Sequence, residues 1–193
     1  MPRSPEKIVV AGHRDARGYL FKKYPTAWRS YSEQVELYHE RVDGARVLGE
    51  HLEKHGVERI VVPRKWLCTL PSRHDVRGKP SYVIVVERFD LLDRDESERL
   101  YRRIDRELLE QLCAILFRFR GLDFSVRNVP FTRDRKIGFI DTEHVKLTKP
   151  RKLGERRDSY EKNLSKLFSD SDRRFALSLW SGFVKSAERN RDR

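Results

Sequence analysis

The chain has 193 residues and a net charge of +12, from 42 Lys and Arg against 30 Asp and Glu. The hydrophobic fraction of 38% is enough for a globular core, and no window of about 18 apolar residues exists, which excludes a membrane span. The N-terminus lacks the apolar core of a signal peptide, so we expect a cytoplasmic protein. The excess positive charge suits nucleic acid, anionic lipid or a phosphorylated substrate, but it is equally typical of a solvated surface.

The first half of the chain predicts strands around one long helix. Short β-type runs at residues 7–12 and 18–24 are expected to form two strands. From residue 32 to residue 55 the apolar positions step by three or four, which predicts a helix. Two further β-branched runs, at 60–63 and 81–87, are expected to be strands, and the second is apolar on both faces and therefore central.

The second half is richer in helix. A second long helix is expected after residue 93, with Asp93 or Asp95 as its first cap and Gly121 at its end. A hairpin follows over residues 128–141, with a polar turn in its middle. Further helices are expected at 159–168 and 172–188. Strands that come early and helices that come late predict an α+β protein.

Three polar residues on the hairpin and its approach form the candidate site. Asp123 directly follows the expected second helix, Asn128 comes five residues later at the start of a strand, and Asp141 ends the paired strand. Their carboxylate and amide oxygens are the hard ligands that Mg²⁺ prefers, and their positions let them converge at the mouth of one hairpin. Each residue taken alone is also a common turn-former.

These residues resemble the protein-kinase-like superfamily. The catalytic loop of that family reads HRDxxxxN, and this chain has Gly121-Leu-Asp123-Phe-Ser-Val-Arg-Asn128. Where the family has the metal-binding Asp of DFG, after the next hairpin, this chain has Ile140-Asp141-Thr142-Glu143. In outline the chain is closer to the compact bacterial small-molecule and lipopolysaccharide-core kinases than to protein kinases.

The resemblance implies a fold, an activity and two cofactors. The fold would be a compact two-lobe one, with a small antiparallel-sheet N-lobe plus one long helix over residues 1–88 and a shortened, mostly helical C-lobe over 89–193. The activity would be ATP- and Mg²⁺-dependent phosphate transfer to a hydroxyl acceptor. The basic charge of the chain is compatible with an anionic acceptor, such as a sugar, lipid or glycan. Asp123 would be the catalytic base, and Asn128 and Asp141 would hold the metal.

The same resemblance implies a nucleotide site in the first lobe. A strand lysine should contact the phosphates and pair with a helix glutamate. Lys22 fits the strand, with Lys23 on the opposite face, and Glu40 is preferred over Glu36 as the partner, although Gln34, Tyr38 and Arg41 lie better beside the apolar stripe. The segment 81–89, with Glu87, would be the strand and hinge on which adenine docks.

The chain departs from the family in ways that leave alternatives open. It has Gly-Leu in place of His-Arg before Asp123, no GxGxxG loop before Lys22, and no APE motif after Asp141. A catalytically inactive pseudokinase that acts as a binding module is the first alternative. A basic nucleic-acid-binding protein is the second, less favoured because the aromatic residues near the C-terminus have helical, core-like spacing.

Overall fold

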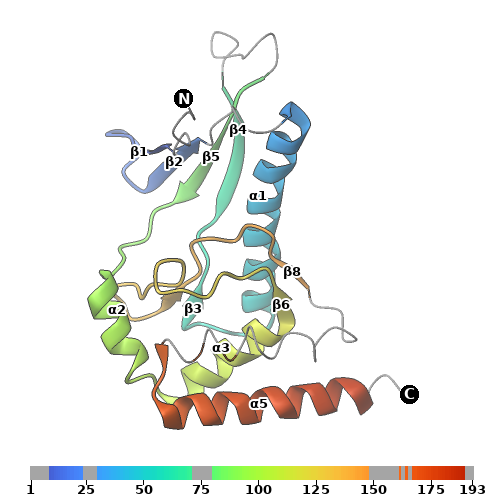
Figure 1. The fold of residues 1–193 in the computed structure, drawn as a ribbon. Coiled ribbons are helices and arrows are strands. Elements are labelled where there is room, and N and C mark those ends of the chain that lie inside the picture. Colours follow the sequence, from blue (N-terminus) through green and yellow to red (C-terminus); the bar gives the residue numbers. More distant parts are fainter. Residues whose placement is uncertain are drawn as a thin grey trace, which may run out of the picture.

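A computed structural model shows a mixed α+β fold (Figure 1). The structure describes residues 9–23, 30–70, 80–147, 161, 164 and 167–189. A four-stranded antiparallel sheet lies at one end of the molecule, and the helices from the second half of the chain lie at the other end. The helix predicted at 159–168 falls mostly outside the described residues.

The sheet has the strand order β1-β2-β5-β4, with every neighbouring pair antiparallel. Its strands are β1 (Val9–Gly12), β2 (Tyr19–Lys23), β4 (Lys65–Thr69) and β5 (Tyr82–Glu87). Strands β1, β2 and β5 confirm the sequence prediction, and β5 is central as expected because it pairs on both sides. Strand β4 is a correction, since the sequence analysis placed no strand there.

The register places two lysines on the face of the sheet that packs against the long helix. Lys22 of β2 lies opposite Ile84 of β5, and Lys65 of β4 lies opposite Val86. Ile84 and Val86 are two residues apart and both buried, so they and their cross-strand partners share one face. Lys23 alternates to the other face, as predicted.

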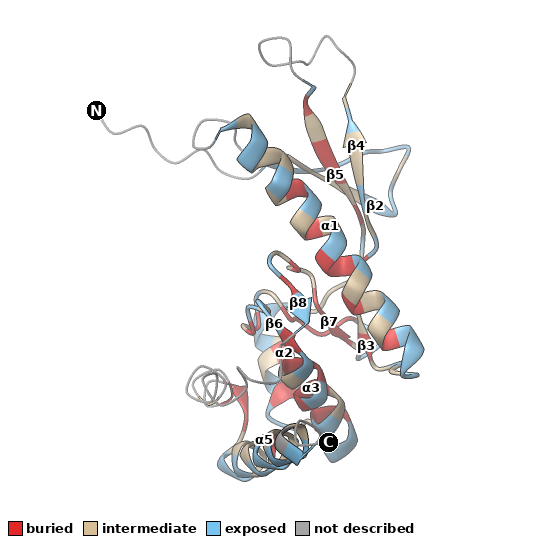
Figure 2. Ribbon diagram, turned by 90° about the vertical axis from the view of Figure 1, so that its right-hand side faces the viewer, coloured by how far each residue is buried: buried red, intermediate tan, exposed pale blue. Residues whose placement is uncertain are grey.

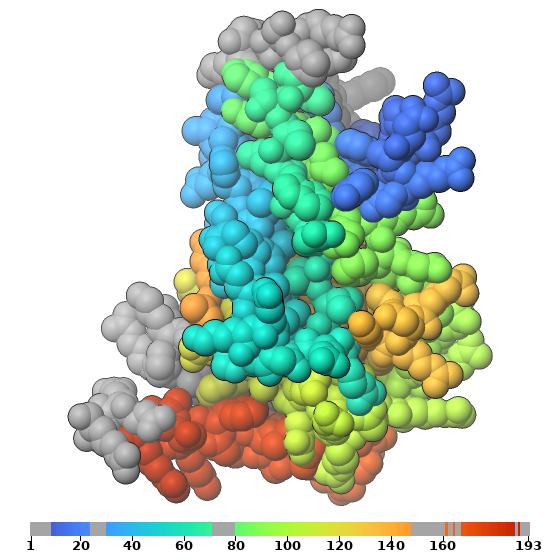
Figure 3. All heavy atoms as spheres, turned by 180° about the vertical axis from the view of Figure 1, so that it is seen from behind, coloured from blue at the N-terminus to red at the C-terminus, as the bar shows by residue number. Residues whose placement is uncertain are grey.

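Helix α1 (Tyr31–Lys54) connects the two ends of the molecule. It begins in a capping box in which the Ser30 hydroxyl accepts from the Glu33 amide while the Glu33 carboxylate accepts from the Ser30 amide at 2.7 Å. Tyr38 packs in a small core with Ile84 and Val86 of the sheet, whereas Leu48 and Leu52 belong to the larger core of the second half. Figure 2 marks the buried residues of α1 in red, and Figure 3 shows α1 beside the segment that contains β4.

The hairpin predicted over residues 128–141 is confirmed. Within it, the Gly138 amide donates to the Pro130 carbonyl at 2.8 Å, and the Ile140 amide donates to the Asn128 carbonyl at 3.0 Å. Its second arm also contains β7 (Ile137–Gly138), which pairs in parallel with β3 (Ile60–Val61), the strand predicted at 60–63. A second short pair is antiparallel and joins β6 (Phe119–Arg120) to β8 (Lys146–Leu147).

The prediction of a single long helix after residue 93 is wrong, because the structure has two helices there. Helix α2 (Arg94–Tyr101) begins at Asp93 with a capping box, and helix α3 (Arg106–Arg118) begins at Asp105, whose carboxylate accepts from the Leu108 amide at 3.0 Å. The second cap restarts the helix after a break of four residues.

Helix α5 (Asp170–Arg189) packs against α3 and closes the larger core, with Ala176 and Trp180 buried. It matches the helix predicted at 172–188. No helix among the described residues is long and apolar enough to cross a membrane.

Candidate functional site

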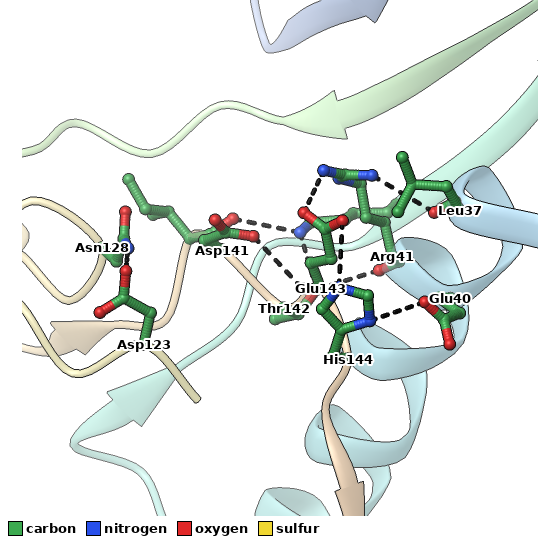
Figure 4. Close-up of polar contacts among 11 residues, drawn as sticks. Leu37, Glu40, Arg41, Asp123, Asn128, Asp141, Thr142, Glu143 and His144 are labelled. Carbon is green, nitrogen blue, oxygen red and sulfur yellow. Dashed lines mark hydrogen bonds and ion pairs between the residues drawn. The ribbon is translucent and has the colours of Figure 1, made fainter. Parts of the chain in front are cut away.

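The loop from Asp123 to Asn128 folds back on itself so that its two ends meet. The backbone N–H of Asn128 donates to the Ser125 carbonyl at 2.8 Å, and the backbone N–H of Ser125 donates to the Asp123 carbonyl at 3.1 Å. The side chains close the loop, because Asn128 Nδ2 donates to Asp123 Oδ2 at 2.6 Å (Figure 4). A carboxylate only accepts, so this bond turns the amide nitrogen of Asn128 toward Asp123 and leaves its Oδ1 for another ligand.

Asp141 is brought to the same place by the hairpin. Its neighbour Ile140 is hydrogen-bonded to Asn128 across the two arms. The Asp141 carboxylate accepts from the Glu143 amide at 3.2 Å, a bond within its own turn. Among the described residues no cation forms an ion pair with this carboxylate, although it is half-buried. Figure 4 places Asp141 between the Asp123–Asn128 pair and a second group of charges.

Two side-chain oxygens on the hairpin are of the type that Mg²⁺ prefers. Asn128 Oδ1 and Asp141 Oδ2 are hard ligands that accept no hydrogen bond from the described residues. Mg²⁺ in phosphate-transfer sites is held by one or two such groups together with phosphate oxygens and water. No group of three His, Cys, Asp or Glu side chains with metal-binding geometry occurs among the described residues, so a site made of protein ligands alone is not supported there.

Lys22 reaches this site from the sheet. Burial lowers the pKa of its ammonium group, the Asp141 charge opposes that shift, and the Arg41 charge adds to it. The three groups are therefore close enough to interact electrostatically. Lys22 is half-buried and makes no hydrogen bond or ion pair with the described residues. A half-buried ammonium group without an acceptor is costly unless a ligand supplies one.

Lys65 is the site residue that the sequence analysis missed. Its ammonium group donates to Thr142 Oγ1 at 2.7 Å and to the Ile140 carbonyl at 3.1 Å, so it holds the residues on both sides of Asp141. Burial lowers its pKa to about 7, with Lys22 adding to the shift and Asp141 opposing it. The alternation of Lys65-Trp-Leu-Cys-Thr69 after Pro63 was the available signal for a strand with an inward lysine.

Helix α1 contacts the Asp141 segment through buried polar interactions. The buried Arg41 forms an ion pair with Glu143, and the Thr142 hydroxyl donates to the Arg41 carbonyl at 3.0 Å (Figure 4). Gly44 lets the helix approach closely, because a Cβ there would overlap the Thr142 carbonyl oxygen. These contacts fix the distance between α1 and the loop that carries Asp141.

The two predicted cofactor-binding glutamates have other partners in the structure. Glu40 accepts from Lys146 Nζ at 3.0 Å and lies 2.7 Å from His144 Nδ1. The Lys146 hydrogen bond is the main cause of a lowered Glu40 pKa. Glu87 forms an ion pair with Arg64 at 3.2 Å. Neither glutamate has a described contact with Lys22, so their roles toward a nucleotide stay predictions.

The comparisons with known proteins identify no family for this chain. No model of a known protein family matches the sequence, and no curated protein matches it.

Proposed function

We propose that the chain is an ATP- and Mg²⁺-dependent phosphotransferase with a two-lobe, protein-kinase-like arrangement, acting on a hydroxyl acceptor. The observation that carries the proposal is the half-buried Lys22 ammonium group, which interacts electrostatically with Asp141 and makes no hydrogen bond or ion pair with the described residues. The hairpin that carries Asp141 also carries Asn128, and each of the two has one side-chain oxygen that accepts no hydrogen bond from the described residues. A cation together with hard oxygen donors is what binding of a metal-bound polyphosphate requires.

The charge balance of the site also favours an anionic ligand. Three cationic side chains, Lys22, Arg41 and Lys65, interact electrostatically with two carboxylates, Asp141 and Glu143. Arg41 is committed to Glu143, and Lys65 donates to neutral oxygens. Lys22 is therefore the cation available to donate to phosphate oxygens, in the role that the family gives to its strand lysine.

Each polar residue has one task in the proposed reaction. Asn128 and Asp141 would hold Mg²⁺, which when bound neutralises charge on the phosphates. Asp123 is exposed, and one of its carboxylate oxygens remains free of Asn128. That oxygen takes the proton of the acceptor hydroxyl as the hydroxyl oxygen bonds to the γ-phosphorus and the bridging bond to ADP breaks.

A scaffold without turnover is the second candidate, and two observations favour it. The connection between β1 and β2 is a tight turn, in which the Ala16 amide donates to the His13 carbonyl at 3.1 Å, and not a glycine-rich loop. Glu40 is engaged by Lys146 and His144. A scaffold that binds nucleotide without transfer would give an ATP–Mg²⁺ thermal shift and no ADP release in the presence of any acceptor.

The test of the proposed site uses two neighbouring lysines. Lys22→Met should abolish the rise in melting temperature that ATP–Mg²⁺ produces in the parent, because Lys22 is the proposed phosphate-binding cation and interacts electrostatically with Asp141. Lys23→Met is the matched control, since Lys23 lies on the other face of β2 opposite Val9, and it should keep the rise. An equal nucleotide response from both variants would show that Lys22 does not contact the phosphates.

A further inference from the structure

A cavity of about 460 Å³ lies beside the loop that joins Asp123 to Asn128. Its wall includes the entire interior of that loop, residues 124–127, together with Arg94 and Glu98 of α2 and Leu167. The wall therefore begins one residue from Asp123 and ends one residue from Asn128. A volume of this size is within the range of small-molecule sites.

The lining combines an apolar floor with a cationic rim. Phe124, Val126 and Leu167 are buried and supply the apolar part. Among the described residues, the rim has two guanidinium groups and one carboxylate, which give a net positive charge. Arg94 donates from Nε to Glu98 at 2.8 Å, whereas Arg127 makes no hydrogen bond or ion pair with the described residues. Arg127 is the cation available to a ligand.

We propose that this cavity binds the acceptor, and that the acceptor is a small hydroxyl-bearing molecule with an anionic group held by Arg127. The proposal rests on the proposed phosphotransferase function. The apolar floor would carry the body of the molecule, and guanidinium groups bind phosphates and carboxylates through paired N–H donors. Anchoring at Arg127 keeps the acceptor against the loop whose first residue, Asp123, would take the hydroxyl proton.

Direct binding tests the cavity without nucleotide or turnover. The probes are glucose 6-phosphate, glycerol 3-phosphate and glucuronate, each compared with its neutral parent, glucose or glycerol, by calorimetric titration. We expect at least one anionic probe to bind more tightly than its neutral parent. Arg127→Gln should weaken that binding by about 10- to 100-fold, the usual effect of losing a hydrogen bond to a charged group. The phosphate and carboxylate probes distinguish the two possible anionic groups.

Arg135→Gln is the control. Arg135 is also exposed and without a described partner, but it lies at the turn of the hairpin, at the far end from Asn128. Equal weakening by both variants, or anionic probes that bind no better than neutral ones, would overturn the proposal.

A second readout separates this proposal from the proposed function. Arg127→Gln should keep the parent's ATP–Mg²⁺ thermal shift, because Arg127 lines the cavity and has no described interaction with Asp141 or Lys22. If the parent shows no nucleotide shift but still binds an anionic probe through Arg127, the phosphotransferase proposal fails and the cavity assignment stands. If the nucleotide shift is present and no anionic probe depends on Arg127, the acceptor assignment fails alone.

Discussion

Asp123 and Asp141 belong to one loop and hairpin, but the proposed reaction gives them different tasks. Asp141→Asn should abolish both the ATP–Mg²⁺ thermal shift and turnover, since the carboxylate of the proposed metal site is lost. Asp123→Asn should leave the thermal shift nearly intact and lower turnover by a factor of about 10² to 10⁴, as for loss of a positioned base. Thermal-shift titration and ADP release measure the two effects separately.

The outcome depends on Asp123 having no structural task of its own. Its side chain bonds to Asn128, and an Asn at position 123 can still accept from Asn128 Nδ2 through its own oxygen. If the Asp123→Asn variant unfolded, the result would show that Asp123 is needed to form the turn. If both variants bound nucleotide with the parent's affinity, Asp141 would not be a metal ligand.

Lys65 should give the protein a stability that rises with pH. Its pKa is about 7 in the folded chain against 10.5 for an ordinary lysine, so between these values the unfolded chain holds one more proton at this residue. The free energy of unfolding therefore increases as the pH rises from about 7 to about 10. Urea unfolding across this range should show a smaller rise for Lys65→Met than for the parent. An equal rise in both would mean that Lys65 titrates normally.

At the residue scale, the sequence predicts those residues of the candidate site that follow a spacing. Asp123, Asn128 and Asp141 were found because their separation matches a motif on the expected elements, and Lys22 was distinguished from Lys23 by strand alternation. Lys65 belongs to no motif, and its role depends on a burial that only the packing of β4 against α1 creates. Arg41 was recognised as lying beside the apolar stripe, but its ion pair with Glu143 joins residues 102 positions apart.

At the scale of elements, the junction of α1 with the Asp141 segment carries the geometry of the site. Gly44→Ala places a Cβ against the Thr142 carbonyl, and such overpacking should lower the free energy of unfolding by about 1–3 kcal/mol. Gly49→Ala on the same helix is the control, because its Cβ would lie 3.4 Å from Val62 Cγ1, an ordinary contact, and helix propensity favours Ala. Urea denaturation compares the two. Equal stability of both variants would show that α1 is free to move away from the loop.

Element boundaries were predictable where a cap or glycine marks them. Ser30 and Gly56 lie beside the two ends of α1, and the prediction was within a residue at each. The break between α2 and α3 was missed because Leu100, Ile104 and Leu108 continue the four-residue spacing straight through it. Only the cap at Asp105, which also binds Arg59 through two hydrogen bonds, reveals that a new helix begins.

At the scale of the whole molecule, α1 is shared between the two ends of the fold. Its first half packs on the sheet, and its second half packs with Ile60 in the larger core. The Asp141 segment meets α1 between these two halves, at Arg41 and Gly44. A nucleotide held by Lys22 on one side and by Asn128 and Asp141 on the other would bridge the sheet and the hairpin. The boundary predicted after residue 88 stays a prediction.

Nucleotide binding by the intact chain is the most direct measurement of this arrangement. With ATP–Mg²⁺ near 100 times its dissociation constant, linkage stabilises the folded state by about 2.7 kcal/mol. For a chain of this length, we expect the melting temperature to rise by about 5–10 °C, with no rise for ATP when Mg²⁺ is removed by chelation. An unchanged melting temperature with millimolar nucleotide and either Mg²⁺ or Mn²⁺ would contradict the nucleotide site and favour a nucleic-acid-binding protein or a scaffold that binds no nucleotide.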